Sequence, residues 1–88
     1  MLEQEITVSN RLGLHARASA KLVQLVSTFK ATVHLVSKGR EVNAQSIMGV
    51  MMLAAEFGAS ITLRATGPDA DEALEALASL VASRFGET

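Results

Sequence analysis

The sequence contains no cysteine, tryptophan or tyrosine, and it has a single proline. Without cysteine it can form neither a disulfide framework nor a thiolate zinc site, and two histidines alone make a poor metal site. The only aromatic residues are three phenylalanines, too few for a stacking platform that binds single-stranded nucleic acid. The eight basic residues are spread along the chain and the net charge is −1. We therefore expect no bound metal and no nucleic-acid partner.

Long hydrophobic runs are also absent. The longest, residues 47–55, has nine residues, whereas a membrane-spanning helix needs about 20. Residues 1–5 lack the basic and apolar segments of a secretion signal. No Walker-type loop or dinucleotide fingerprint occurs, so no cofactor is expected. These absences predict a cytoplasmic protein without membrane insertion.

What the chain does have is aliphatic residues. Hydrophobic residues make up 49% of its 88 positions. A chain of this length buries only about 60–65% of its unfolded surface, which is enough for one compact core. We expect a single domain over residues 1–88, and nothing in the sequence argues for more than a monomer.

The hydrophobic period changes several times along the chain. Alternation of apolar and polar residues predicts strands at residues 5–9, 32–35, 40–43 and 61–65. A helical period predicts helices at residues 16–29, 47–53 and 70–84. Lys38-Gly39 is typical of a tight hairpin turn, and Asp69 with Glu72 resembles a capping pair.

These segments follow the order strand, helix, strand, strand, helix, strand, helix. Each strand has only one apolar face, so its other face meets water. The sequence therefore predicts an α+β open-faced β-sandwich, in which a four-stranded, mainly antiparallel sheet carries three helices on one face. This fold class alone does not determine the function.

The segment with the most chemistry lies at the start of the first helix. His15 falls where the helical N–H groups lack intrahelical partners, and such an end binds anions. A neutral imidazole has a lone pair that can attack phosphorus. Arg17 could clamp phosphate oxygens, and Gly13 lets the loop adopt a positive φ. The same residues also fit a histidine that only caps the helix or lies on the surface.

Residues 13–17, Gly-Leu-His-Ala-Arg, closely resemble the active-site signature of the HPr family. These proteins are the histidine-containing phosphocarriers of the bacterial phosphoenolpyruvate-dependent sugar phosphotransferase system. Residues 46–51, Ser-Ile-Met-Gly-Val-Met, resemble the regulatory-serine segment of the family. The resemblance extends over nearly the whole chain, and the expected element order agrees with the family fold.

The resemblance implies a carrier of phosphoryl groups and not a turnover enzyme. His15 would accept a phosphoryl group on Nδ1 from enzyme I, using phosphoenolpyruvate, and would donate it to a IIA domain. Arg17 and nearby backbone N–H groups, including that of Ala16, would hold the group. Ser46 would be phosphorylated by an ATP-dependent HPr kinase/phosphorylase in organisms that have one.

Two positions depart from the family pattern. Ala18 stands where the family usually has proline, and Ser19 where it usually has alanine. Proline is favoured in a first helical turn because its missing N–H has no acceptor there. Alanine is also a good helix former, so we expect the helix to persist with less rigidity at its start.

The short second helix has its own candidate residues. Ser46 can act as an ordinary helix N-cap, which competes with a regulatory role. We expect Ile47, Met48 and Met51 to form an adaptable apolar patch beside His15 that partners share, and Met52 to fill the core.

Two other functions fit these residues. A regulatory paralogue, such as a nitrogen-branch carrier, would use the same chemistry while its phosphorylation state is read by binding partners. A small α+β ligand-binding or interaction module would use His15 only as a cap.

Overall fold

The computed structural model describes residues 1–53 and 55–86. The elements are, in chain order, β1 (Leu2–Thr7), α1 (Ala16–Val26), β2 (Thr32–Ser37), β3 (Arg40–Asn43), α2 (Ile47–Met52), β4 (Ser60–Thr66) and α3 (Ala70–Ala82). A turn of 3-10 helix, η1 (Arg84–Gly86), follows α3. Before that turn, the order is the one that the sequence predicts.

The four strands form one sheet in the order β1-β4-β2-β3, and every pairing is antiparallel. β2 and β3 are joined by a two-residue turn at Lys38 and Gly39, where φ is +52° and +78°. Positive φ at both central residues is the geometry that suits the twist of a hairpin. The tight turn expected at Lys38-Gly39 is therefore confirmed.

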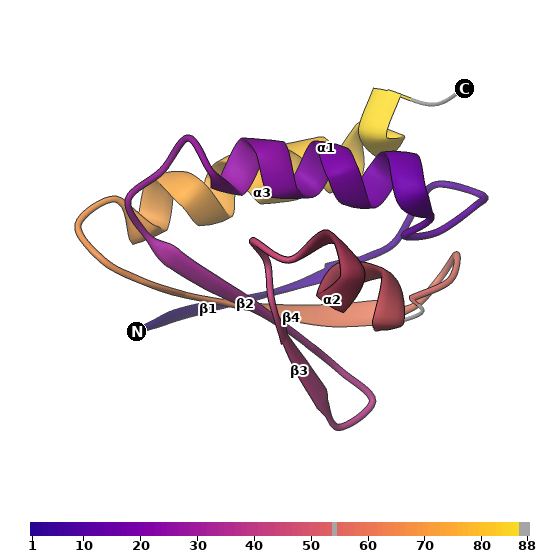
Figure 1. Cartoon of the computed structure of the whole chain (residues 1–88), viewed down its shortest axis with the longest axis horizontal. Helices are drawn as coiled ribbons and strands as arrows, with labels where there is room; N and C mark the ends of the chain where they lie inside the picture. Colours follow the sequence, from indigo (N-terminus) through magenta and orange to yellow (C-terminus); the bar gives the residue numbers. More distant parts are fainter. Residues whose placement is uncertain (54, 87–88) are drawn as a thin grey trace.

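The helices cover one face of this sheet and leave the other open. α1 and α3 lie side by side across the strands (Figure 1), and α2 packs against α1 and β3. This arrangement confirms the α+β open-faced sandwich. No helix in the described part of the chain is long and apolar enough to cross a membrane.

The core fills the space between the sheet and the helices. Burial alternates along β2 and β4, as expected for strands with one face in the core and the other toward water. The helices contribute the apolar stripes that the sequence predicts. The fully buried core residues include Val33, Leu35, Ile61 and Leu63 from the sheet, Ala18, Leu22 and Val26 from α1, and Ala73, Leu77 and Phe85 from the C-terminal part of the chain.

The largest differences from the predicted boundaries lie in β1 and α1. β1 covers residues 2–7 and not 5–9, because Val8 exchanges backbone hydrogen bonds with the loop at Gly58 and Ala59 instead of continuing the β4 ladder. α1 ends at Val26 and not at residue 29. The hydroxyl groups of Ser27 and Thr28 donate to backbone carbonyls one turn earlier, which competes with continued helix formation.

The expected capping pair of Asp69 and Glu72 is also wrong. Asp69 is the N-cap residue of α3, but its side chain makes no capping hydrogen bond. Its two carboxylate oxygens instead accept the backbone N–H groups of Lys30, at 2.9 Å, and Ala31, at 2.8 Å. The carboxylate thus joins the start of α3 to the connection between α1 and β2. Sequence spacing does not reveal this partner, which lies 38 residues away.

Candidate functional site

His15 is the N-cap residue of α1. Its backbone is extended, with φ −74° and ψ −178°, and its imidazole Nδ1 accepts a hydrogen bond from the backbone N–H of Arg17 at 3.3 Å. The predicted position at the start of the helix is therefore correct. The ring takes the place that a serine or aspartate oxygen occupies in most capped helices.

This hydrogen bond sets the direction of the Nδ1 lone pair. Because Nδ1 accepts the Arg17 N–H, its lone pair points at the helix end, and in the neutral ring the proton lies on Nε2. The helix end carries the positive pole of the backbone dipole. His15 is half-buried, while Ala16 and Arg17 are exposed in the first turn. The site thus places the Nδ1 lone pair beside the first-turn backbone N–H groups of α1, and such a helix end binds anions.

The loop before His15 is held against a second loop. Gly13 has φ +66°, and a Cβ built there would collide with the carbonyl oxygen of Ala55. The same oxygen accepts the backbone N–H of Leu14 at 2.9 Å. Glycine is therefore required at residue 13 for two reasons, its conformation and this close approach.

Two buried polar side chains at this loop were not among the candidates that the sequence suggested. Asn10 is 1% exposed and donates through Nδ2 to the Gly13 carbonyl at 2.7 Å. Ser19 is fully buried and donates through Oγ to the Leu14 carbonyl at 3.0 Å. Ser19 lies on the apolar stripe of α1 with Leu22, and a serine on such a stripe is the signal that could have identified it.

Ser46 caps α2, as expected. Its Oγ accepts the backbone N–H of Gly49 at 3.0 Å, and the side chain is exposed. Next to it, Ile47, Met48 and Met51 are 43%, 71% and 41% exposed.

The expectation that Met52 fills the core is wrong, since it is 64% exposed. Val50 in this short helix and Leu53, its C-cap residue, point inward instead. Met52 therefore adds to the apolar surface of α2. The loops that meet at Leu14 and Ala55 add two more exposed apolar side chains, Leu12 and Phe57, at 72% and 65%.

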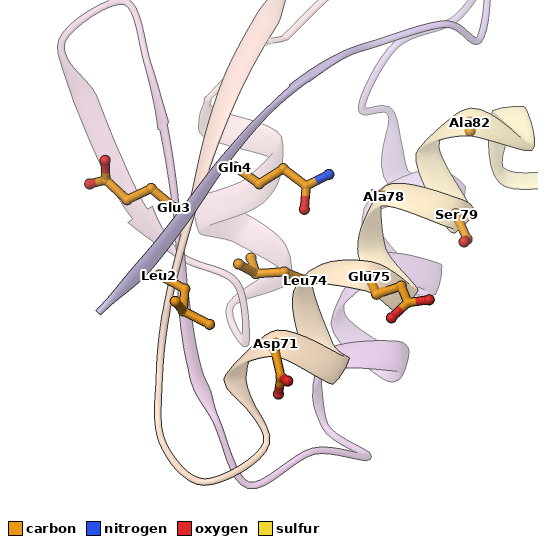
Figure 2. Close-up of a pocket in the computed structure, with 9 residues that line it drawn as sticks. All are labelled: Leu2, Glu3, Gln4, Asp71, Leu74, Glu75, Ala78, Ser79 and Ala82. Carbon is orange, nitrogen blue, oxygen red and sulfur yellow. The ribbon is translucent and has the colours of Figure 1, made fainter.

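A groove elsewhere contains none of these residues. It lies between β1 and α3 and has a volume of about 620 Å³. Figure 2 shows Gln4 extending toward α3, while Glu3 points to the other side of β1, where it pairs with Arg64 at 2.7 Å. Within residues 1–53 and 55–86, no group of three His, Asp or Glu side chains could hold a metal ion.

Known proteins resemble the whole chain. Residues 2–83 match the sequence model of the PTS HPr component phosphorylation site. The chain belongs to the HPr family. The phosphocarrier protein HPr of Cupriavidus necator is 56% identical over 87 residues, which are 99% of this chain and 98% of that protein. The phosphocarrier protein NPr of Shewanella violacea is 44% identical over 86 residues, covering 98% and 94% of the two chains.

The fold agrees with this membership. The crystal structure of HPr-C-His from Thermoanaerobacter tengcongensis superposes with a TM-score of 0.96 and 42% identity, and the match covers 100% of this chain and 99% of that one. This HPr-family chain is thus a phosphocarrier of the phosphotransferase system. Such proteins shuttle phosphoryl groups and are not turnover enzymes.

Proposed function

We propose that the protein accepts a phosphoryl group from phosphorylated enzyme I on Nδ1 of His15 and donates it to IIA domains. The observation that carries this proposal is the hydrogen bond from the Arg17 N–H to Nδ1, at 3.3 Å. It keeps the lone pair of Nδ1, and not that of Nε2, at the helix end, where backbone N–H groups could donate to a transferred phosphoryl group. A histidine that capped through another atom would not offer this.

In the proposed transfer, the bond between phosphorus and the donor atom of enzyme I breaks while a bond forms between phosphorus and Nδ1 of His15. Nδ1 supplies the electron pair of the new bond, and the donor atom leaves with the electron pair of the broken bond. The His15 ring gains a positive charge in this step, which it loses when its Nε2 proton passes to solvent. The Arg17 N–H then donates to a phosphoryl oxygen instead of to Nδ1, together with the N–H of Ala16. The exposed Arg17 guanidinium supplies a bidentate clamp for the charge.

The test is intact-mass analysis after incubation with enzyme I, magnesium and phosphoenolpyruvate. We expect one acid-labile phosphoryl adduct on the wild type and none on His15→Ala. His34→Ala is the matched control, because it removes the chain's other histidine from β2 and should keep the adduct. Absence of the adduct on the wild type with an active cognate enzyme I would contradict the proposal, and His15 would then be a cap in an interaction module.

A nitrogen-branch carrier is the second candidate. The 44% identity to an NPr gives it support, although identity to an HPr is higher, at 56%. Both candidates need the same chemistry at His15. Competition between the enzyme I proteins of the sugar branch and the nitrogen branch of the host would separate them, and we expect faster phosphorylation by the sugar-branch enzyme.

We propose that Ser46 is a regulatory phosphorylation site for an HPr kinase/phosphorylase where the host has one. A phosphoserine adds a charge of about −1.5 to −2, which the start of α2 accepts locally. On a surface that docks an acidic partner, the same charge opposes binding. Ser46→Asp should therefore lower the rate of transfer from enzyme I, whereas Ser46→Asn, a neutral N-cap residue, should retain it. Equal rates for the two variants would contradict this electrostatic mechanism.

We also propose that Ile47, Met48 and Met51 form the apolar part of the partner surface. Their exposure on a helix that contacts α1 supports this, since contiguous exposed apolar residues mark interaction sites. Chemical-shift mapping on adding a IIA domain should perturb the methyl signals of Met48 and Met51 and leave that of Met1 in place. Unperturbed Met48 and Met51 would rule the patch out.

We propose that residues 1–88 act as one domain, in the cytoplasm, without nucleic-acid or membrane partners. The helices and the sheet share one core, which supports the single domain.

We propose that the protein is a monomer. Light scattering at micromolar concentration would test this, and a mass of twice 9.3 kDa would contradict it.

A further inference from the structure

We propose that Ser19 is a positioning residue for phosphoryl transfer, because its hydroxyl fixes the backbone that carries the His15 ring. The proposal rests on the proposed function of His15. Ser19 lies one turn into α1 and is fully buried, so it contacts neither solvent nor a partner protein. Any effect that it has on transfer must pass through the residues it holds.

Ser19 makes hydrogen bonds to two consecutive backbone carbonyls, those of Leu14 and His15. Its backbone N–H donates to the His15 carbonyl at 2.8 Å, which is the ordinary helical bond. Its Oγ donates to the Leu14 carbonyl at 3.0 Å. Leu14 lies before the helix and is itself buried, so the hydroxyl satisfies a carbonyl at the point where the chain turns into α1.

The peptide groups just before His15 are fixed from the other side as well. Asn10 accepts the Gly13 N–H through its own carbonyl at 3.2 Å and donates through Nδ2 to the Gly13 carbonyl at 2.7 Å. The Leu14 N–H donates to Ala55. The Ser19 hydroxyl completes this set of hydrogen bonds around Gly13 and Leu14.

This support matters because the Leu14–His15 peptide group sets the direction in which the His15 side chain leaves the backbone. The contact between Nδ1 and the Arg17 N–H is already long, at 3.3 Å, and the ring is half-buried. A small rotation of the Leu14–His15 peptide would move Nδ1 away from the N–H and leave its lone pair misdirected. Misplacement of a reacting group by about 1 Å costs up to about 100-fold in rate.

The neighbouring residue gives the proposal a second basis. Ala18 leaves the backbone torsion of this turn free, whereas a proline would fix its φ near −65°. Ser19 and Ala18 are the two positions at which the sequence departs from the HPr signature. We infer that the hydroxyl of Ser19 supplies, in this chain, the constraint that a proline at residue 18 would otherwise supply.

The test compares Ser19→Ala with the wild type in phosphorylation by enzyme I. We expect kcat to fall at least about tenfold while KM for this protein stays within about twofold, because the buried residue makes no partner contact. The ¹⁵N spectrum of the His15 ring should change in parallel, with Nδ1 and Nε2 becoming more alike as the second tautomer is populated.

The control is Ser37→Ala, which removes a hydrogen bond of the same kind from a buried serine in the sheet, from Oγ to the Ser60 carbonyl at 2.9 Å. It should lower stability without changing kcat or the ring spectrum. The double variant Ala18→Pro/Ser19→Ala should recover most of the lost kcat. Proline is tolerated in a first turn, where the N–H groups have no helical acceptor.

Wild-type kcat and an unchanged ring spectrum in Ser19→Ala would overturn the proposal. A lower kcat with an unchanged ring spectrum would also overturn it, since Ser19 would then affect transfer without positioning the ring. These outcomes are distinct from a failure of the proposed function, in which the wild type itself would take up no phosphoryl group.

Discussion

Gly13 lies where the His15 loop passes so close to the loop at Ala55 that a Cβ would collide with the Ala55 carbonyl oxygen. Backbone and side-chain hydrogen bonds from Asn10, Ser19 and Ala55 hold the peptide groups of Gly13 and Leu14 there. The candidate residues His15, Arg17 and Ser46 could be predicted because helix starts leave a recognisable pattern in sequence. Asn10 could not, because its bonds to Gly13 depend on how a loop folds back on itself.

At the residue scale, Gly13→Ala should destabilise the fold by about 3 kcal/mol or more. The left-handed conformation costs about 1–2 kcal/mol for a residue with a Cβ, and the collision with Ala55 adds to it. Gly39→Ala is the matched control, since Gly39 has φ +78° but no atom within 4 Å of a built Cβ. Urea denaturation of both variants checks this, and equal losses would show that the contact with Ala55 contributes nothing.

At the scale of elements, side-chain hydrogen bonds and ion pairs join helices, strands and loops that are distant in sequence. The Asp69 carboxylate holds the loop after α1 against the start of α3. On the open face of the sheet, Arg64 pairs with Glu3 at 2.7 Å and Glu41 at 3.3 Å. These ion pairs are exposed, so each contributes at most about 1 kcal/mol. The Asp69 contacts are the more important of the two because the carboxylate accepts two backbone N–H groups, one of them at the buried residue Ala31.

Asp69→Asn should lower the free energy of unfolding by about 1–3 kcal/mol. The amide can accept one of the two backbone N–H groups but must turn its own N–H₂ toward the other. Asp71→Asn is the control, because Asp71 is exposed in the same first turn and its change should stay within about 0.5 kcal/mol. Chemical denaturation of the two variants distinguishes them. If both lost the same amount, general charge at the helix start would be the cause.

At the scale of the whole molecule, the C-terminal turn closes the core. Phe85 is 1% exposed and is among the largest fully buried side chains, although its backbone has φ +55°. Lys21 on α1 donates from Nζ to the Phe85 carbonyl at 2.6 Å. The turn thus connects α1 with the end of α3, and apolar burial holds a backbone conformation that phenylalanine disfavours on its own.

Phe85→Ala should destabilise the protein by about 3–5 kcal/mol, since it removes a buried ring and leaves a cavity between the helices. Phe57→Ala removes the same ring from an exposed loop position, where it is 65% exposed, and should cost less than about 0.5 kcal/mol. Thermal unfolding of the two variants gives the comparison. A small loss for Phe85→Ala would mean that the C-terminal turn does not contribute to the core.

The sequence by itself determined the order of elements, the one-sided strands, the tight turn at Lys38-Gly39 and the position of His15 at a helix start. Each of these depends on periodicity or on residues that are near neighbours in the chain. The tertiary structure alone decided the role of Asp69, the exposure of Met52 and the contact between Leu14 and Ala55. Each of those depends on which distant parts of the chain pack against one another, and only the folded molecule brings them together.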